Sequence, residues 1–121
     1  MTQARRALGA SGEDQAARWY EANGYQVVAR NWRCRYGELD IIAADNASRT
    51  AVFVEVKTRT GDGFGGVAEA VPPQKVRRLR RLAARWLAAH PDRRGVPVRF
   101  DVVSVRREAG LVRVGHLRGA F

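Results

Sequence analysis

The chain has 121 residues, 45% of them hydrophobic and 28% charged, and a net charge of +10. This length fits one domain, residues 1–121, and the composition is that of a folded globular protein rather than a disordered chain. One cysteine and two histidines exclude an internal disulfide and a zinc cluster of recognisable spacing. Because the sequence contains neither an apolar span of about 20 residues nor a signal core, we expect a cytoplasmic protein without a membrane segment.

The positive charge predicts a polyanionic partner. Twenty-two lysines and arginines face only twelve acidic residues, and nucleic acid is the polyanion that arginine forks pair with best. An alternative is that genome composition favours arginine and the charge only aids solubility. Only two positions, Lys57 and Lys75, are lysine among these basic residues. Their retention against the pressure toward arginine favours the nucleic-acid interpretation.

A first helix is predicted over Glu13–Asn23. Ser11 followed by Asp14 resembles a capping box at its start, and Gly24 is a typical stop signal. Between them, alanines and aromatic residues recur at helical spacing. The sequence therefore places an acidic residue, Glu13, at the beginning of this helix.

Three strands are predicted to follow the first helix. They cover Tyr25–Arg30, Glu38–Ala43 and Thr50–Thr58. We expect Arg33–Tyr36 to be a basic connector between the first two, and the turn-rich segment Asp45–Ser48 to close a hairpin between the second and third. These antiparallel connections would place the second and third strands side by side.

Strand alternation assigns the side chains of these strands to faces. In the second strand, Leu39 and Ile41 are expected on one face, and Asp40 and Ile42 on the other. In the third strand, one face would carry Val52, Val54 and Val56, and the opposite face Phe53, Glu55 and Lys57. The face with Glu55 and Lys57 is the one that could carry chemistry.

A second helix is predicted to begin at Pro72-Pro73 and to end at His90-Pro91. Its apolar stripe consists of Val76, Leu79, Leu82, Ala83, Trp86 and Leu87, and its solvated side of Arg77, Arg78, Arg81 and Arg85. Two strands, Val96–Val105 and Leu111–Leu117, are expected after it. The order α-β-β-β-α-β-β predicts an α/β fold with a mixed sheet flanked by helices.

Carboxylates on neighbouring strands indicate a metal site. Asp40 and Glu55 would lie on adjacent strands of the hairpin, with Lys57 two positions beyond Glu55 on the same face. A hard cation such as Mg²⁺ or Mn²⁺ takes carboxylate oxygens and water, and an ammonium group beside it can orient the attacking water. Glu13 is a third candidate carboxylate, and Glu38 a lesser one that could equally point into solvent.

These residues resemble a known signature. Gly37-Glu38-Leu39-Asp40 followed by Val54-Glu55-Val56-Lys57 is similar to the PD-(D/E)XK nuclease motif, although Leu39 stands where that motif has proline. More closely, these segments resemble the bacterial YraN-like family of predicted endonucleases, distant relatives of the archaeal Holliday junction resolvases. Further matching segments are Gly12-Glu13, Asn31-Trp32-Arg33-Cys34, Phe53 to Arg59 and Arg99-Phe100-Asp101.

The resemblance implies a restriction-endonuclease-like αβββαβ core and a metal-dependent endonuclease that hydrolyses phosphodiesters. By the same resemblance, Asp40 and Glu55 hold Mg²⁺ or Mn²⁺, the carbonyl of Val56 is a further ligand, Lys57 is the catalytic lysine, and Glu13 matches the helix-one acid. A homodimer is expected by analogy with the resolvases, since a junction requires two cuts.

Nucleic-acid contacts are expected from basic residues around this site. The candidates are Arg33, Arg35, Arg59, Lys75 and Arg78. Trp32 is flanked by arginines and could stack on bases, whereas Trp19 and Trp86 lie on helical stripes and are expected in the core. The loop Thr60–Gly66 matches G-x-G-x-x-G, but no helix begins there, so a dinucleotide site is rejected. Its glycines could approach a nucleic-acid strand or simply form a connection.

Three hypotheses follow for the function. The first is a metal-dependent nuclease acting on DNA, including branched or otherwise structured DNA. The second is a nucleic-acid-binding protein that keeps the nuclease scaffold without catalysis. The third, a hydrolase of a small phosphorylated or glycosidic substrate, is disfavoured by the net charge of +10.

Overall fold

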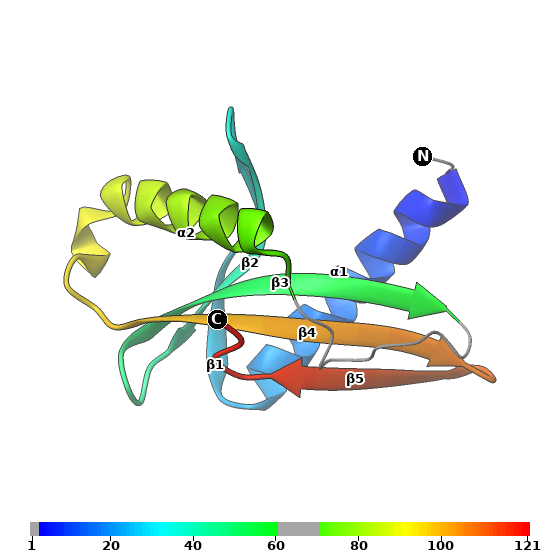
Figure 1. Cartoon of the computed structure of the whole chain (residues 1–121). Coiled ribbons are helices and arrows are strands. Elements are labelled where there is room, and N and C mark those ends of the chain that lie inside the picture. The colour runs from blue at the N-terminus through cyan, green and yellow to red at the C-terminus, as the bar shows by residue number, and fades with distance from the viewer. Residues whose placement is uncertain (1–2, 61–70) are drawn as a thin grey trace.

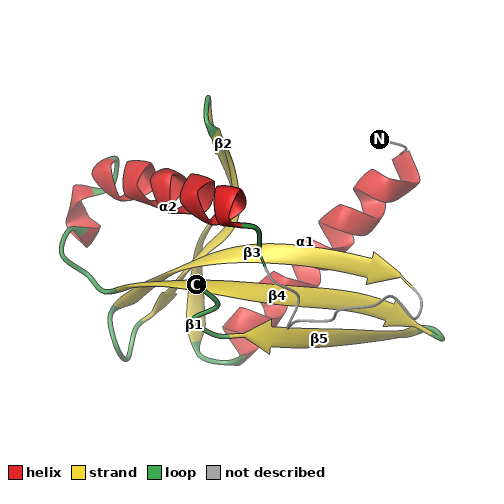
Figure 2. Cartoon of the chain, in the orientation of Figure 1, coloured by secondary structure: helices red, strands yellow, loops and turns green. Residues whose placement is uncertain are grey.

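A five-stranded sheet lies between two helices in the computed structural model, which describes residues 3–60 and 71–121 (Figures 1 and 2). The elements are α1 (Gln3–Ala22), β1 (Tyr25–Cys34), β2 (Gly37–Asp45), β3 (Thr50–Thr60), α2 (Pro73–Ala88), a 3₁₀ turn η2 (Pro91–Arg93), β4 (Val98–Glu108) and β5 (Leu111–Leu117). Neither described helix is long and apolar enough to cross a membrane. The expected order of elements is confirmed, and the 3₁₀ turn is the one addition among the described residues.

The sheet is mixed, as predicted. Its strands follow the order β1-β2-β3-β4-β5, and all neighbours are antiparallel except β3 and β4, which are parallel. A parallel pair needs a long crossover, and the segment that contains α2 supplies it. The α/β fold class is therefore confirmed, with β3 at the centre of the sheet.

Each face of the sheet is covered by one helix. On the α1 face, Ala16, Ala17 and Tyr20 pack on Ile41, Ala43, Val52, Val54, Val103 and Val105. On the α2 face, Leu79, Leu82, Ala83 and Trp86 pack on Leu39, Ile42, Ala51, Phe53 and Phe100. The apolar stripe predicted for the second helix is thus the one that the structure buries, and the strictly alternating β3 contributes to both clusters.

Several predicted boundaries were wrong. The first helix begins at Gln3, so that Ser11 lies inside it and does not cap it. β1 continues to Cys34, which leaves only Arg35 and Tyr36 as the hairpin tip rather than a four-residue connector. β4 begins at Val98, two residues later than expected. The glycine-rich segment 61–66 lies outside the described residues.

Helix α1 approaches β3 closely at Gly12. A Cβ atom added to Gly12 would lie 2.2 Å from Oγ1 and 3.1 Å from Cγ2 of Thr58. Because both branches of the threonine side chain are in the way, rotation about its Cα–Cβ bond cannot make room. Only glycine fits at this contact. It lets α1 approach the sheet closely, and Glu13 is the next residue along the helix.

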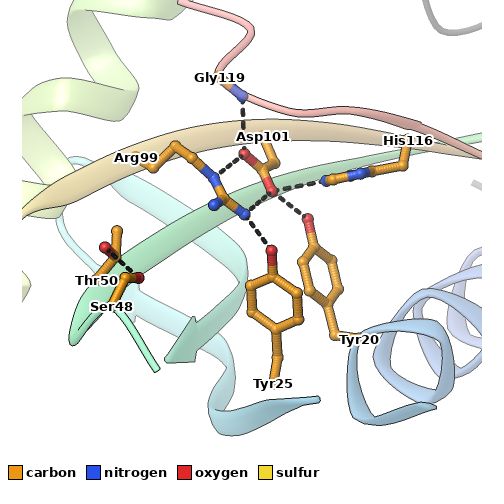
Figure 3. A network of polar contacts seen from close by, with 8 residues as sticks. All are labelled: Tyr20, Tyr25, Ser48, Thr50, Arg99, Asp101, His116 and Gly119. Atoms are coloured by element: carbon orange, nitrogen blue, oxygen red, sulfur yellow. Dashed lines mark hydrogen bonds and ion pairs between the residues drawn. The ribbon is translucent and has the colours of Figure 1, made fainter. Parts of the chain in front are cut away.

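A buried carboxylate ties the far ends of the chain together (Figure 3). Asp101 is fully buried on β4. Its oxygens accept hydrogen bonds from Arg99 Nε and Nη2, both 2.9 Å, from Tyr20 Oη and His116 Nε2, both 2.8 Å, and from the Gly119 backbone N–H, 3.0 Å. Burial alone would raise the pKa of Asp101, but these donors hold it below its usual value. The Arg99-Phe100-Asp101 motif therefore has a structural role.

Candidate metal site and basic groove

The candidate site lies where β2 and β3 separate. Their pairing runs from Asp45 opposite Thr50 to Ile41 opposite Val54, and beyond that pair the two strands diverge (Figure 1). Asp40 and Glu55 are the next residues along the two strands, and the charge of Glu55 raises the pKa of Asp40, so the two carboxylates lie within electrostatic reach of each other. We call this place, where β2 and β3 separate, the fork.

The divergence begins with an irregularity in β2 that sequence alternation did not predict. Leu39 packs in the cluster under α2 together with Ile42, whereas Ile41 faces α1. The prediction that Leu39 and Ile41 share a face was therefore wrong. On the neighbouring β1, the pairing with β2 shifts register between Val27 and Ala29, and Asn31 has a φ of 53° in the left-handed region.

Asp40 takes over a backbone hydrogen bond at the fork. Its Oδ2 accepts the N–H of Val56 at 2.8 Å, a donor that has no partner strand on this side once β2 has turned away. Burial, and after it the charges of Glu55, Glu13 and Glu38, together raise the pKa of Asp40 to about 7 against the opposing effect of this hydrogen bond. The hydrogen bond holds the carboxyl group in place, but the surroundings stabilise its ionised form poorly.

Glu55 is engaged from the opposite side by helix α2. Lys75, in the first turn of α2, forms an ion pair with Glu55 Oε1, and the side chain of Glu55 is only 11% exposed. Lys75 was predicted as a nucleic-acid contact, and its ammonium group in this structure neutralises a predicted metal ligand instead. No sequence pattern indicates this pair, because the two residues are brought together by the crossover.

Glu13 projects from α1 toward the same region. Burial raises its pKa and so does the nearby charge of Glu38, against a hydrogen bond from Asn31 and the positive charge of Arg30. Arg30 Nη2 lies 3.9 Å from Glu13 Oε2. Glu38 in turn lies 3.6 Å from Arg33 Nε. The mutual effects on pKa show that Glu13 and Glu38 are within electrostatic reach of Asp40.

The donor set at the fork fits a magnesium or manganese ion held by few protein ligands. In the described parts of the chain, no three acidic, histidine or cysteine side chains gather closely enough to hold a metal ion. Mg²⁺ usually retains several waters and binds through one or two carboxylates together with substrate phosphates. Asp40 and Glu55 offer this number. The pKa of Asp40 is raised first by burial and then by neighbouring carboxylates, whose negative charge a divalent cation would offset.

The remaining predicted site residues lie on β3. Lys57 is half-buried, and strand alternation places it on the same face as Glu55. Val56 gives its N–H to Asp40, and its role as a carbonyl ligand stays a prediction. Arg59 is half-buried in the same strand.

A basic groove adjoins the fork on the α2 side. It has a volume of about 360 Å³ and is lined by Tyr36, Gln74, Arg77, Arg78 and Arg81; we call it the Tyr36 groove. Of the predicted nucleic-acid contacts, Arg78 lines the groove, and Arg35 and Arg33 lie exposed on the hairpin beside it. Tyr36 was missed in the sequence, where its position between a basic pair and Gly37 was the only available signal.

Trp32 is half-buried and packs with Cys34 and Tyr36 against the cluster beneath α2. Its stacking on bases stays a prediction. Trp86 is fully buried and Trp19 packs on the α1 cluster, as expected.

Comparison with known proteins identifies relatives of the chain. The model of the uncharacterised protein family UPF0102 matches residues 12–105. A UPF0102 protein of Mycobacterium sp. (strain KMS) is 64% identical over 105 residues, covering 87% of this chain and 77% of the relative. A second, from Mycolicibacterium smegmatis, is 65% identical over 102 residues, covering 84% and 82% respectively. The matched range contains all of the fork and groove residues.

Proposed function

The chain belongs to the uncharacterised protein family UPF0102, which is the YraN-like family expected from its motifs, and we propose that it is a metal-dependent endonuclease acting on DNA. The observation that carries this proposal is the fork, where Asp40 and Glu55 lie within electrostatic reach of each other as two strands separate. Electrostatically coupled carboxylates near a groove rich in arginine match the opposite charges of a metal ion and a phosphodiester backbone.

The residues of this site would divide the work of phosphodiester hydrolysis. Asp40 and Glu55 would hold Mg²⁺ or Mn²⁺, with the Val56 carbonyl and Glu13 as further candidates for the metal shell. A bound divalent ion lowers the pKa of water and neutralises charge on the phosphate. Lys57, on the same face as Glu55, would orient the attacking water, and the hydrogen bond from Val56 would hold the carboxylate of Asp40 in place as a metal ligand.

Cleavage assays on fork variants test the proposal. Supercoiled plasmid and a synthetic four-way junction are incubated with Mg²⁺ or Mn²⁺, and with chelator in parallel. We expect cleavage by the wild type only with metal, and losses of about 100-fold or more in Asp40→Asn and Lys57→Ala. Asp45→Asn, at the other end of β2, is the matched control and should cut normally. Equal cleavage by wild type and both fork variants would contradict the assignment.

A non-catalytic nucleic-acid-binding protein is the second candidate. The ion pair between Lys75 and Glu55 favours it, since a carboxylate that is already neutralised is less available to a metal. If this alternative holds, the affinity for nucleic acid should weaken steeply with salt, and duplex, single-stranded and four-way substrates should not be cleaved. Cleavage that depends on Asp40 would exclude it.

Branched DNA is a specific substrate hypothesis within the proposal. One chain offers one fork, whereas resolution of a four-way junction requires two cuts, so this substrate requires a homodimer. Sedimentation of the protein with and without junction DNA would test the pairing. A monomer that cuts linear duplex as fast as a junction would contradict it.

A further inference from the structure

The Tyr36 groove has an unusual internal organisation. Tyr36, at the tip of the β1–β2 hairpin, lies among three guanidinium groups that come from two elements. The Cζ atoms lie 3.8 Å (Arg85), 4.8 Å (Arg35) and 6.0 Å (Arg81) from the centroid of its ring. Arg35 also donates a hydrogen bond to the Tyr36 hydroxyl. The aromatic ring therefore gathers cations at one place through cation–π attraction.

The hairpin tip lies beside helix α2. A Cβ atom on Gly37 would lie 3.4 Å from Leu82 Cδ1 and 3.7 Å from Arg78 Cδ, and Gly37 has a φ of 141° that side chains rarely adopt. Tyr36, next to this glycine, and the arginines of α2 therefore line the groove from two different elements.

The arginines that line the Tyr36 groove have no carboxylate partner among the residues that the structure describes. No carboxylate in the described ranges 3–60 and 71–121 forms an ion pair with Arg77, Arg78 or Arg81. Like charges at helical spacing repel one another unless an anion lies between them. An uncompensated set of guanidinium groups around a groove is the arrangement expected for a phosphate ligand.

The groove extends from the fork along α2. Lys75 contacts Glu55 at the fork, and Gln74 beside it already lines the groove. From Gln74 to Arg81, the residues of α2 that line the groove, the helix rises about 10 Å, which equals roughly three base steps of B-form DNA. This length suits an extended polyanion better than a single phosphate.

We propose that the Tyr36 groove binds the phosphodiester backbone of a DNA strand leading to the fork, and that Tyr36 is the positioning residue for its arginines. The inference deepens the proposed function and rests on it for the identity of the polyanion. The inference predicts that Tyr36, an uncharged side chain, controls an electrostatic interaction with DNA. A general attraction between DNA and a protein of net charge +10 predicts no such effect.

The test measures DNA binding in chelator, so that it does not depend on cleavage. Fluorescence anisotropy with a fluorescein-labelled 20-bp duplex compares Tyr36→Phe with Tyr36→Leu, two variants of unchanged net charge. The phenylalanine keeps the ring, and binding should stay within about twofold of wild type; leucine should weaken it about five- to tenfold. Thermal melts confirm that both variants are folded.

A pair of charge variants keeps the test decisive if Tyr36→Leu unfolds. Arg77→Gln/Arg81→Gln should lower the slope of log K against log salt by about 2, whereas Arg49→Gln/Arg94→Gln, with the same charge change at distant turns, should leave it nearly unchanged. Equal binding by the leucine and phenylalanine variants, or equal losses in the two double variants, would overturn the inference. Binding that follows the expected pattern without any metal-dependent cleavage would uphold the groove and refute the nuclease.

Discussion

Neutralising Asp40 should stabilise the protein at neutral pH. Burial and the charges of Glu55, Glu13 and Glu38 raise the pKa of Asp40 from 3.8 to about 7. Between these two values the folded protein holds a proton that the unfolded chain has released. The free energy of unfolding therefore falls as pH rises through this window, by about 1.4 kcal/mol per pH unit. Below this pH window Asp40 is protonated in both the folded and the unfolded state. Above the window it is ionised in both states, and the loss of stability stays constant.

Asp40→Asn removes this cost and keeps an oxygen acceptor for the N–H of Val56. Two pH units at about 1.4 kcal/mol give an upper limit near 3 kcal/mol for the extra stabilisation of the variant at pH 8 relative to pH 5, and partial solvent access reduces the expected value to about 2 kcal/mol. Urea unfolding in chelator at both pH values measures it. The same comparison with Asp45→Asn, at the turn end of β2, should show no such pH-dependent gain.

The opposite result would refute this account of the fork. If Asp40→Asn were less stable than wild type at pH 8, the carboxylate would be a stabilising structural group, comparable to Asp101, and not one held at a cost. Adding Mg²⁺ at pH 8 supplies an independent measurement. A cation bound at the fork should stabilise wild type and leave the asparagine variant almost unchanged, since binding to the native state alone raises its stability.

Other contacts lead to further predictions. Lys75→Met should raise the affinity for Mn²⁺ measured by titration calorimetry, by about tenfold, because the metal no longer competes with the ammonium group for Glu55. A lower or unchanged affinity would mean that the ion pair does not oppose metal binding. Gly12→Ala should lower stability in urea by about 1–3 kcal/mol, because overpacking against Thr58 outweighs the gain in helix propensity; a stabilised variant would show that α1 can shift. Asp101→Asn should cost about 3–5 kcal/mol, since it leaves buried donors with fewer acceptors, and a cost below about 1 kcal/mol would contradict its structural role.

The sequence predicts the fold where local patterns are strict. Alternation along β3 assigns Val54 and Phe53 correctly to opposite faces, and the 3.6-residue stripe of α2 identifies the residues that the structure buries. The hairpin between β2 and β3 is equally local, so the neighbourhood of Asp40 and Glu55 follows from counting residues on either side of the turn. These features depend on periodicity and turn chemistry alone.

The parts that could not be predicted depend on contacts across the fold. The register shift between Val27 and Ala29 and the positive φ at Asn31 make β1 irregular, and no sequence signal marks either of them. The pairing of Lys75 with Glu55 is created by the crossover helix. Tyr36 gains its arginine neighbours from α2, 45 residues or more along the chain. No sequence pattern within a single helix or strand predicts any of these features.

Asp101 and Asp40 show how the same side chain can meet opposite electrostatic surroundings. Asp101 is surrounded by donors, and its pKa is held below the usual value, so its ionised form stabilises the fold at neutral pH. Asp40 has a backbone donor and three carboxylates within electrostatic reach, and burial together with these charges raises its pKa to about 7. The divalent cation that we propose for the fork would offset the charges of these carboxylates and would turn their repulsion into favourable binding energy.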